Sequence, residues 1–168
     1  GQDGAGVYEK YQEGVDRALE ELGDQVEVVA TLHGDWLTDK AYDCTTDLIS
    51  SGEEFDYIFA NNDMMAQGCY QALEDNDMTD IPIVSTGGSP DGFELLESGV
   101  EAANMTAPVS IQGIQTFKNL YDFVVDGKEP EEKFKSLPVI PVSADDTSSY
   151  IAWDDYAAAY DYVYGENK

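Results

Sequence analysis

The feature that most limits how this chain can fold is a regular alternation of two apolar patterns along its length. One pattern repeats every three or four residues, as on one face of a helix, and its first example runs from Val7 to Leu22 and ends at Gly23. The other is a short run of apolar and β-branched residues between turn residues, which is typical of a buried strand. This alternation favours an α/β fold in which a mostly parallel sheet lies between helices, a three-layer α-β-α arrangement.

The two patterns also locate the elements. We expect helices at 7–22, 36–50, 61–73, 89–96, 109–125 and 152–164, and strands at 26–32, 55–60, 81–85, 100–105 and 137–142. Ser89 followed by Pro90 is a strong signal for the start of a helix. In the last helix, the residues expected to face inward are Ile151, Tyr156, Ala159, Tyr160 and Val163.

The charge balance excludes several classes of partner. Eight Lys and Arg against 35 Asp and Glu give a net charge of −27. Such a chain repels the phosphates of nucleic acids and the anionic surface of a membrane. Hydrophobic residues make up 42% of the 168 positions, which is enough to bury a core. We therefore expect a compact acidic globule that binds no nucleic acid.

Signals for catalysis or metal binding are sparse. Cys44 and Cys69 lie on apolar helical faces and are expected to be buried free thiols, with a disulfide as the alternative. The sequence has no GxSxG motif and no CxxC pair, and its single histidine, His33, has no nucleophile beside it. We expect no catalytic residue, no metal and no cofactor. A phosphate or flavin at the loop 86–89 is the alternative, but no Lys or Arg lies in the candidate loops.

In an open parallel sheet, ligands bind beyond the carboxyl ends of the strands. This rule selects four loops, at 33–36, 61–63, 86–91 and 106–108. They offer Asn, Thr, Ser and glycine backbone groups together with one large aromatic side chain. Such a mixture suits a neutral polyhydroxylated ligand that amides hold and a ring stacks against. The candidate ligand-binding residues are Trp36, Asn62, Thr86, Gly87, Asn104 and Thr106.

Several of these candidates also have a purely structural interpretation. Asn62 can cap the helix that follows it, and Asp63 can do the same. Trp36 can pack on its own helix as a hydrophobic staple. Gly87 can serve only to form the turn. The sequence leaves these alternatives open.

One stretch resembles a known family. It reads Phe59-Ala60-Asn61-Asn62-Asp63-Met64-Met65-Ala66-Gln67-Gly68 and is followed by Ala72-Leu73. It is similar to the type I periplasmic sugar-binding proteins of the ribose-binding branch, in which a strand ends in Phe-Ala-x-Asn-Asp before Met-Ala-x-Gly and Ala-Leu. The resemblance continues through Ser89-Pro90-Asp91-Gly92 and extends back to Asp35-Trp36, so that it covers about 7–126.

The resemblance implies two α/β lobes that close on a ligand and are joined by three crossing strands. It also implies that this chain, which starts at Gly1 without Met, is the carboxyl-terminal half. Residues 1–107 would form the ligand-binding lobe. Residues 108–168 would supply a returning helix, a crossover strand and a terminal helix that complete the lobe or pack on it. The apolar stripe of the helix 109–125 is then expected to dock on the retained lobe or on a second copy, as in a homodimer.

Two site residues carry over directly. Trp36 stands where the family has an aromatic platform for the sugar ring, and Asn62 stands where an Asn bonds sugar hydroxyls. Three others are replaced. The family's Asp is Gly87 here, its Gln is approximately Ala107, and its Arg falls near Glu9 or Tyr11. The polar side chains near enough to substitute are Ser85, Thr86, Asn104 and Thr106.

The expected function is the binding of a sugar or similar small polar solute, with no bond chemistry. The resemblance implies a component of an ABC importer or a sensor, with a membrane permease or sensor protein as partner. It also implies an extracellular or periplasmic location, with a lipoprotein anchor in the parent as one form. Two alternatives stay open: the effector-binding core of a LacI-type transcriptional regulator, which shares the fold and the motif, and a flavodoxin-like enzyme.

Overall fold

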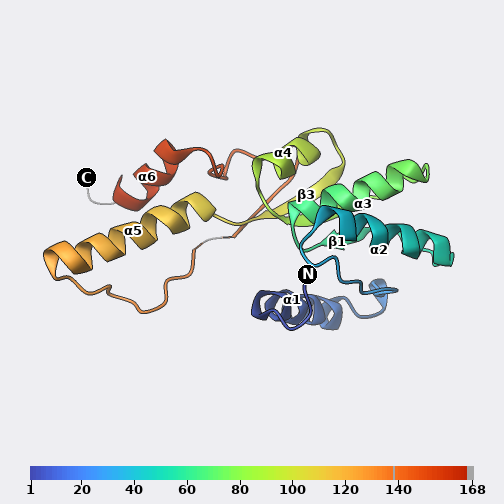
Figure 1. Cartoon of the computed structure of the whole chain (residues 1–168), viewed down its shortest axis with the longest axis horizontal. Helices are drawn as coiled ribbons and strands as arrows, with labels where there is room; N and C mark the ends of the chain where they lie inside the picture. Colours follow the sequence, from blue (N-terminus) through green and yellow to red (C-terminus); the bar gives the residue numbers. More distant parts are fainter. Residues whose placement is uncertain (138, 166–168) are drawn as a thin grey trace.

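A computed structural model of the chain describes residues 1–137 and 139–165 (Figure 1). Seven helical segments and four strands follow one another along these residues. They are α1 (Gly6–Leu22), the short 3₁₀ turn η1 (Gly23–Gln25), α2 (Thr38–Ser51), β1 (Ile58–Ala60), α3 (Asp63–Asp75), β2 (Ile83–Gly87), α4 (Pro90–Glu97), β3 (Glu101–Thr106), α5 (Val109–Asp126), β4 (Ile140–Val142) and α6 (Tyr156–Tyr164).

The strands form one sheet in the order β1-β2-β3-β4. The pairs β1–β2 and β2–β3 are parallel, whereas β4 runs antiparallel to β3. Parallel neighbours require crossover connections, and α3 and α4 supply them. The expected α/β class with a mostly parallel sheet is therefore confirmed. As a result, the carboxyl ends of β1, β2 and β3 meet at one edge.

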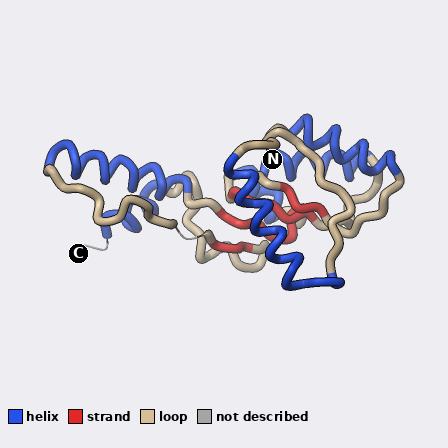
Figure 2. The backbone as a smooth tube through the Cα atoms, turned by 90° about the horizontal axis from the view of Figure 1, so that it is seen from below, coloured by secondary structure: helices blue, strands red, loops and turns tan. Residues whose placement is uncertain are grey.

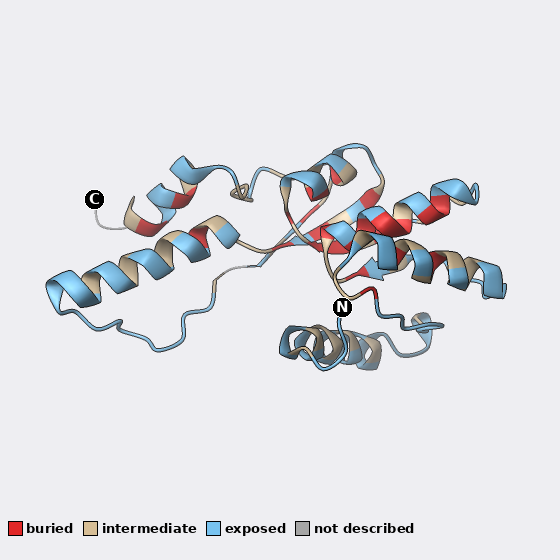
Figure 3. Cartoon of the chain, in the orientation of Figure 1, coloured by how far each residue is buried: buried red, intermediate tan, exposed pale blue. Residues whose placement is uncertain are grey.

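Helices lie on both sides of this sheet. The crossover helix α3 packs on β1 and β2, α4 packs on β3, and α2 packs against α3. Figure 2 shows α1 crossing in front of the strands on the other face. The two sides differ in burial, because α3 carries half of the buried helical positions and α1 has none (Figure 3). The main core joins α2, β1, α3 and β2 through Ala41, Ala60, Met65, Ala66, Cys69, Leu73 and Ile83.

Local capping signals define the two crossover helices as predicted. The Asn62 side chain accepts a hydrogen bond from the backbone N–H of Met65 at the start of α3. Ser89 does the same for Gly92, and Pro90 occupies the first turn of α4. These caps satisfy N–H groups that have no partner inside the helix. Both helices therefore begin at the strand ends, where a ligand would bind.

The expected strand at 26–32 is wrong. This segment has no regular secondary structure, and apart from Val26 its residues are exposed. It is joined to no strand of the sheet, whose β1 edge is open. An isolated strand leaves its backbone groups unpaired and is not stable without a neighbour. The β-branched residues of this segment favour an extended backbone, but the fold provides no neighbouring strand with which the segment could pair.

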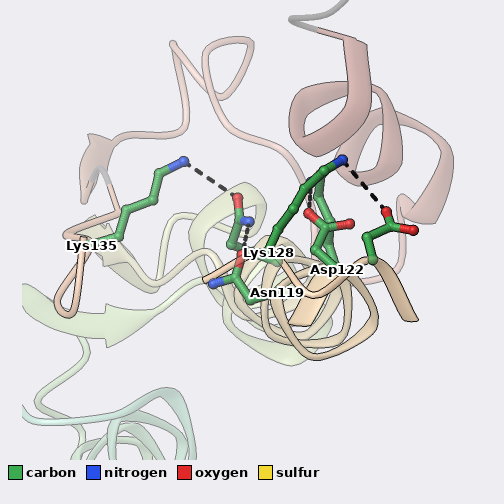
Figure 4. Close-up of polar contacts among 7 residues, drawn as sticks. Asn119, Asp122, Lys128 and Lys135 are labelled. Atoms are coloured by element: carbon green, nitrogen blue, oxygen red, sulfur yellow. Dashed lines mark hydrogen bonds and ion pairs between the residues drawn. The ribbon is translucent and has the colours of Figure 1, made fainter. Parts of the chain in front are cut away.

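The last part of the chain forms a separate small cluster. Here α5 packs against α6 and lies apart from α2, α3 and α4 in Figure 1. Its core contains Ile111, Ala159 and Val163. The loop after α5 returns along the helix, where the Lys135 ammonium donates to the Gln115 amide oxygen at 3.4 Å (Figure 4).

Three expectations for this region need correction. Tyr156 and Tyr160 are 69% and 54% exposed, because α6 turns only one narrow face toward α5. The strand expected at 137–142 is limited to β4, and residue 138 lies outside the described residues. The first of the two expected docking surfaces for the α5 stripe is not the one observed, because α5 packs on α6 rather than on the helices of the retained lobe; docking on a second copy stays a prediction. The apolar side chains of Phe117 and Val124 are 65% and 68% exposed.

The acidic side chains lie outward. Among the described residues, every Asp and Glu is exposed or half-buried except Asp63 and Glu101. Cys44 and Cys69 are both free, with Cys69 buried and Cys44 half-buried. None of the described helices combines the length and apolar character needed to cross a membrane.

Candidate functional site

Three of the predicted site residues lie near one another at the carboxyl ends of β1 and β2. Asn62 follows β1, Thr86 lies near the end of β2, and Trp36 stands in the loop before α2. The Asn62 amide nitrogen lies 3.4 Å from the main-chain oxygen of Trp36, to which it donates. Thr86 Oγ1 donates to the main-chain oxygen of Asn61 at 2.8 Å. These contacts tie the loops together at the carboxyl edge of the sheet; Thr86 itself is only 5% exposed, so its hydroxyl holds the loop after β1 from inside.

Trp36 is held in an unusual backbone conformation. Both Asp35 and Trp36 have positive φ, at 49° and 67°, which non-glycine residues seldom adopt. Strain of this kind persists only where surrounding contacts impose it. The Lys40 ammonium pairs with the Asp35 carboxylate, which neutralises the one charge in this loop beside the indole. The indole ring lies 6.4 Å from the ring of Tyr11. Gly1 also lies close to the indole, because a Cβ atom on it would be 2.8 Å from two carbons of the ring.

Tyr11 is a further candidate at this edge, which the resemblance gave only as one of two positions for the family's Arg. The structure distinguishes the two. Glu9 is exposed, whereas the phenol of Tyr11 lies 3.0 Å from Thr86 Oγ1. Asn61 is a further polar neighbour, because its amide oxygen accepts from the main-chain nitrogen of Gly1 at 2.7 Å.

Gly87 is fixed as glycine by its surroundings. Its φ is 144°, and a Cβ atom there would lie 2.4 Å from a carboxylate oxygen of Asp63. The same carboxylate accepts a hydrogen bond from the backbone N–H of Ser89 at 2.8 Å. Asp63 thus fills the space where a side chain at 87 would begin. A larger residue would have to displace this contact.

Asn104 and Thr106 lie inside the protein. Asn104 is 2% exposed, and its amide nitrogen contacts Asp63 and Glu101. Thr106 is 1% exposed and donates to the main-chain oxygen of Ile140 on β4. Their alternation along β3 brings both to one face of that strand, where neighbouring strands and loops cover them. Like Thr86, these two side chains lie inside the protein and do not reach the surface beside Trp36 and Asn62.

Two aromatic residues after β4 were missed by sequence reasoning. The Tyr150 hydroxyl donates to the main-chain oxygen of Gly88 at 2.9 Å, and its ring stacks on Phe93. The Trp153 indole N–H donates to the main-chain oxygen of Ala107 at 2.8 Å. Both contacts hold the loops at the carboxyl edge. Since they join residues more than 40 positions apart, no local pattern could have indicated them.

The comparisons with known proteins agree with this architecture. The chain is 36% identical over 87 residues to a xylitol-binding protein of Mycolicibacterium smegmatis, covering 51% of this chain and 25% of that protein. It is 29% identical over 105 residues to the D-allose-binding periplasmic protein of Escherichia coli, covering 62% and 34%. This chain therefore spans about a quarter to a third of the curated relatives that it matches.

Solved structures show the same fold. A periplasmic solute-binding protein of an ABC transporter from Actinobacillus succinogenes, with bound D-allose, superposes with a TM-score of 0.82 at 21% identity, covering 89% of this chain and 53% of that one. A second, from Bacillus halodurans with bound myo-inositol, has a TM-score of 0.81 at 24% identity, covering 95% and 53%. Residues 1–129 match the family described as periplasmic binding protein domain, and the chain belongs to that family.

Proposed function

We propose that this chain is the carboxyl-terminal lobe of a solute-binding protein for a neutral sugar or polyol, which delivers its ligand to an ABC importer. The observation that carries the proposal is the grouping of Trp36, Tyr11 and Asn62 at the carboxyl edge of the parallel sheet, with the buried Thr86 hydroxyl contacting Tyr11 and holding the loop after β1. These groups offer aromatic faces and uncharged hydrogen-bonding atoms, which suit hydroxyl-rich ligands.

The charges around this edge support a neutral ligand. Asp35 is paired with Lys40, and Asp63 turns into the protein to meet the backbone of Ser89. Neither carboxylate is left free to bind a cationic substrate. The strongly negative surface of the chain would also repel a polyanionic ligand. The names of the relatives, which include xylitol, D-allose and ribose, fit a ligand of this class.

The division of the chain into two parts is also a proposal. Residues 1–107 hold the sheet and the site, whereas α5 and α6 within 108–168 have a core of their own. The exposed half of α5 is where a first lobe of the parent protein would pack. In the complete protein, closure of two lobes on the ligand would report its presence to a permease or a sensor in the periplasm or outside the cell.

Binding alone accounts for the arrangement of this site, and no nucleophile, acid–base pair or cofactor is needed. The transport proteins among the relatives favour this function over a LacI-type regulator or a flavodoxin-like enzyme.

The test is a calorimetric titration of the full-length parent with xylitol, D-allose, D-ribose and myo-inositol, with D-gluconate as a charged control of similar size. We expect at least one neutral compound to bind and gluconate not to bind. A Trp36→Ala variant should bind the same compound with a higher dissociation constant, read from the shape of the titration curve. Binding of gluconate alone, or of none of the five, would contradict the proposal.

A further inference from the structure

Four polar side chains are buried together beneath the candidate site. They are Asp63 at the start of α3, Ser85 on β2, and Glu101 and Asn104 on β3. Their exposed fractions are 4%, 0%, 1% and 2%, so none of them exchanges hydrogen bonds freely with water. Burying even one carboxylate is costly unless hydrogen bonds or opposite charges compensate for its lost hydration. This cluster contains two.

Five short contacts connect the four side chains. Ser85 Oγ lies 3.1 Å from Asp63 Oδ1 and 2.9 Å from Glu101 Oε1. The Asn104 amide nitrogen lies 2.7 Å from Asp63 Oδ1, 2.8 Å from Ser85 Oγ and 3.0 Å from Glu101 Oε2. Every one of these contacts has hydrogen-bond length.

The available hydrogens do not suffice if both carboxyl groups are ionised. A serine hydroxyl has one hydrogen and an asparagine amide has two, so three hydrogens serve five contacts. Because Ser85 can donate in only one direction, it would face one of the two carboxylates with a lone pair. A hydrogen on Glu101 Oε1 removes this conflict. Glu101 then donates to Ser85, and Ser85 donates to Asp63.

The extra hydrogen belongs on Glu101 rather than on Asp63. The Asp63 carboxylate also accepts from the backbone N–H of Ser89, and it lies at the positive amino end of α3. Both features stabilise its negative charge. Among the residues that the structure describes, Glu101 receives hydrogen bonds only from the side chains of Ser85 and Asn104. In the described part of the chain, no ion pair involves either carboxyl group.

We propose that Glu101 is a protonated carboxylic acid in the folded chain and is a positioning residue for the site, because it aligns Ser85 and Asp63 beneath the loop that carries Gly87 and Ser89. Independently of the hydrogen count, burial is the largest influence on Glu101 and raises its pKa to about 7; hydrogen bonds from Asn104 and Ser85 oppose this rise and the charge of Asp63 adds to it. The phenol of Tyr150 also lies near Asp63, and burial raises the pKa of this phenol above its ordinary value.

Ionisation of Glu101 would disturb the site through a short chain of contacts. Without its hydrogen, Ser85 lies between two negative carboxylates and can satisfy only one. Repulsion between the two buried carboxylates then shifts Asp63 away from the Ser89 N–H. Ser89 caps α4 and lies two residues after Gly87. The loop at the carboxyl edge should therefore loosen as the pH rises through neutrality. This effect of Glu101 ionisation on the loop does not depend on whether the lobe binds a sugar.

The direct test is a pH titration of the Glu101 side-chain carboxyl by ¹³C NMR in the unsubstituted chain, with a short glutamate-containing peptide as external reference. The Glu101 signal should titrate with a midpoint near 7, about 2.5 pH units above the ordinary value of 4.5. A midpoint within half a pH unit of the peptide value would overturn the proposal. This measurement needs no variant.

A second measurement tests the positioning role. Glu101→Gln keeps the shape of the side chain and supplies a permanent donor to Ser85, and Glu97→Gln is the matched exposed control. After correction for intrinsic exchange, amide protection at Ser89 should fall above pH 7 in the unsubstituted chain and in E97Q but stay level in E101Q. Parallel protection profiles in all three proteins would overturn the positioning role, even if Glu101 titrates as expected.

Discussion

The phenol of Tyr11 and the hydroxyl of Thr86 lie 3.0 Å apart and join α1 to the end of β2. This contact matters because α1 has no buried residue of its own and crosses the sheet with few other ties. Thr86 also donates to the main chain at Asn61, so one hydroxyl connects the first helix, the loop after β1 and the second strand. Trp36 lies against the Tyr11 ring on the same side.

Replacing Trp36 by Ala should weaken sugar binding in a full-length parent by about 1–3 kcal/mol, because a stacked ring face is lost. Titration calorimetry with the best ligand measures the change. Trp36→Phe is the matched control and should retain part of the affinity. Equal affinity of the Ala variant and the parent would remove Trp36 from the binding site.

Asn62 can be tested for two roles separately. Asn62→Ser keeps a good helix cap but removes the amide, whereas Asn62→Ala removes both. We expect the Ala variant to lose about 1 kcal/mol of unfolding free energy and the Ser variant to lose much less. Urea denaturation measures this difference. If the Ser variant binds sugar as tightly as the parent, Asn62 serves only as the cap of α3.

Restoring an aspartate at position 87 should damage the fold rather than improve the site. Gly87→Asp places a Cβ against the Asp63 carboxylate and adds a second charge at a strained φ. We expect a loss of about 2 kcal/mol or more in the free energy of unfolding by urea. Gly113→Ala in α5 is the control, since a Cβ atom there would meet no atom beyond its own helix backbone within 4 Å. This control should be neutral or slightly stabilising.

The stability of the chain should fall as the pH rises from about 4.5 to about 7. Burial raises the pKa of Glu101 from 4.5 to about 7, so in this range the folded chain binds a proton that the unfolded chain releases. The contribution is fully present below pH 4.5 and is lost by about pH 7, at a cost of at most about 3 kcal/mol. Urea unfolding at several pH values measures it. The net charge of −27 adds its own trend, so the relevant quantity is the difference from E101Q, which should vanish at low pH.

The exposed half of α5 should make the isolated chain associate with itself. Phe117, Tyr121 and Val124 are all more than half exposed on one helix, which is unusual for a solvated face. Light scattering should give a mass above that of a monomer, and Phe117→Asp with Val124→Asp should return it to the monomer mass. Substituting the polar neighbours Gln112 and Thr116 by Asp is the control and should have no effect. A monomer with this face fully solvated would contradict the prediction.

The sequence by itself determined the crossover helices and their starting points. Asn62 and the pair Ser89-Pro90 were recognisable because a helix cap acts on an N–H group only two or three residues away. Short apolar runs between turn residues are likewise local signals, and they were enough to predict β2, β3 and the loops that join these strands to helices. From these, the position of a site at the carboxyl edge followed by general topology.

Only the tertiary structure decided which segments pair as strands and which side chains are buried. The 26–32 segment has a strand-like sequence but no neighbouring strand, and a sheet is stable only through pairing between distant residues. Asn104 and Thr106 look like ligand residues along the chain, yet the packing of β3 turns both inward. Glu101 looks like one more surface acid among 35, and it becomes a buried acid only because Asp63, Ser85 and Asn104 close around it. Helix-capping hydrogen bonds join residues that are close in sequence, so the sequence alone can indicate them. Burial and strand pairing depend on contacts between distant residues, which form only when the whole chain folds.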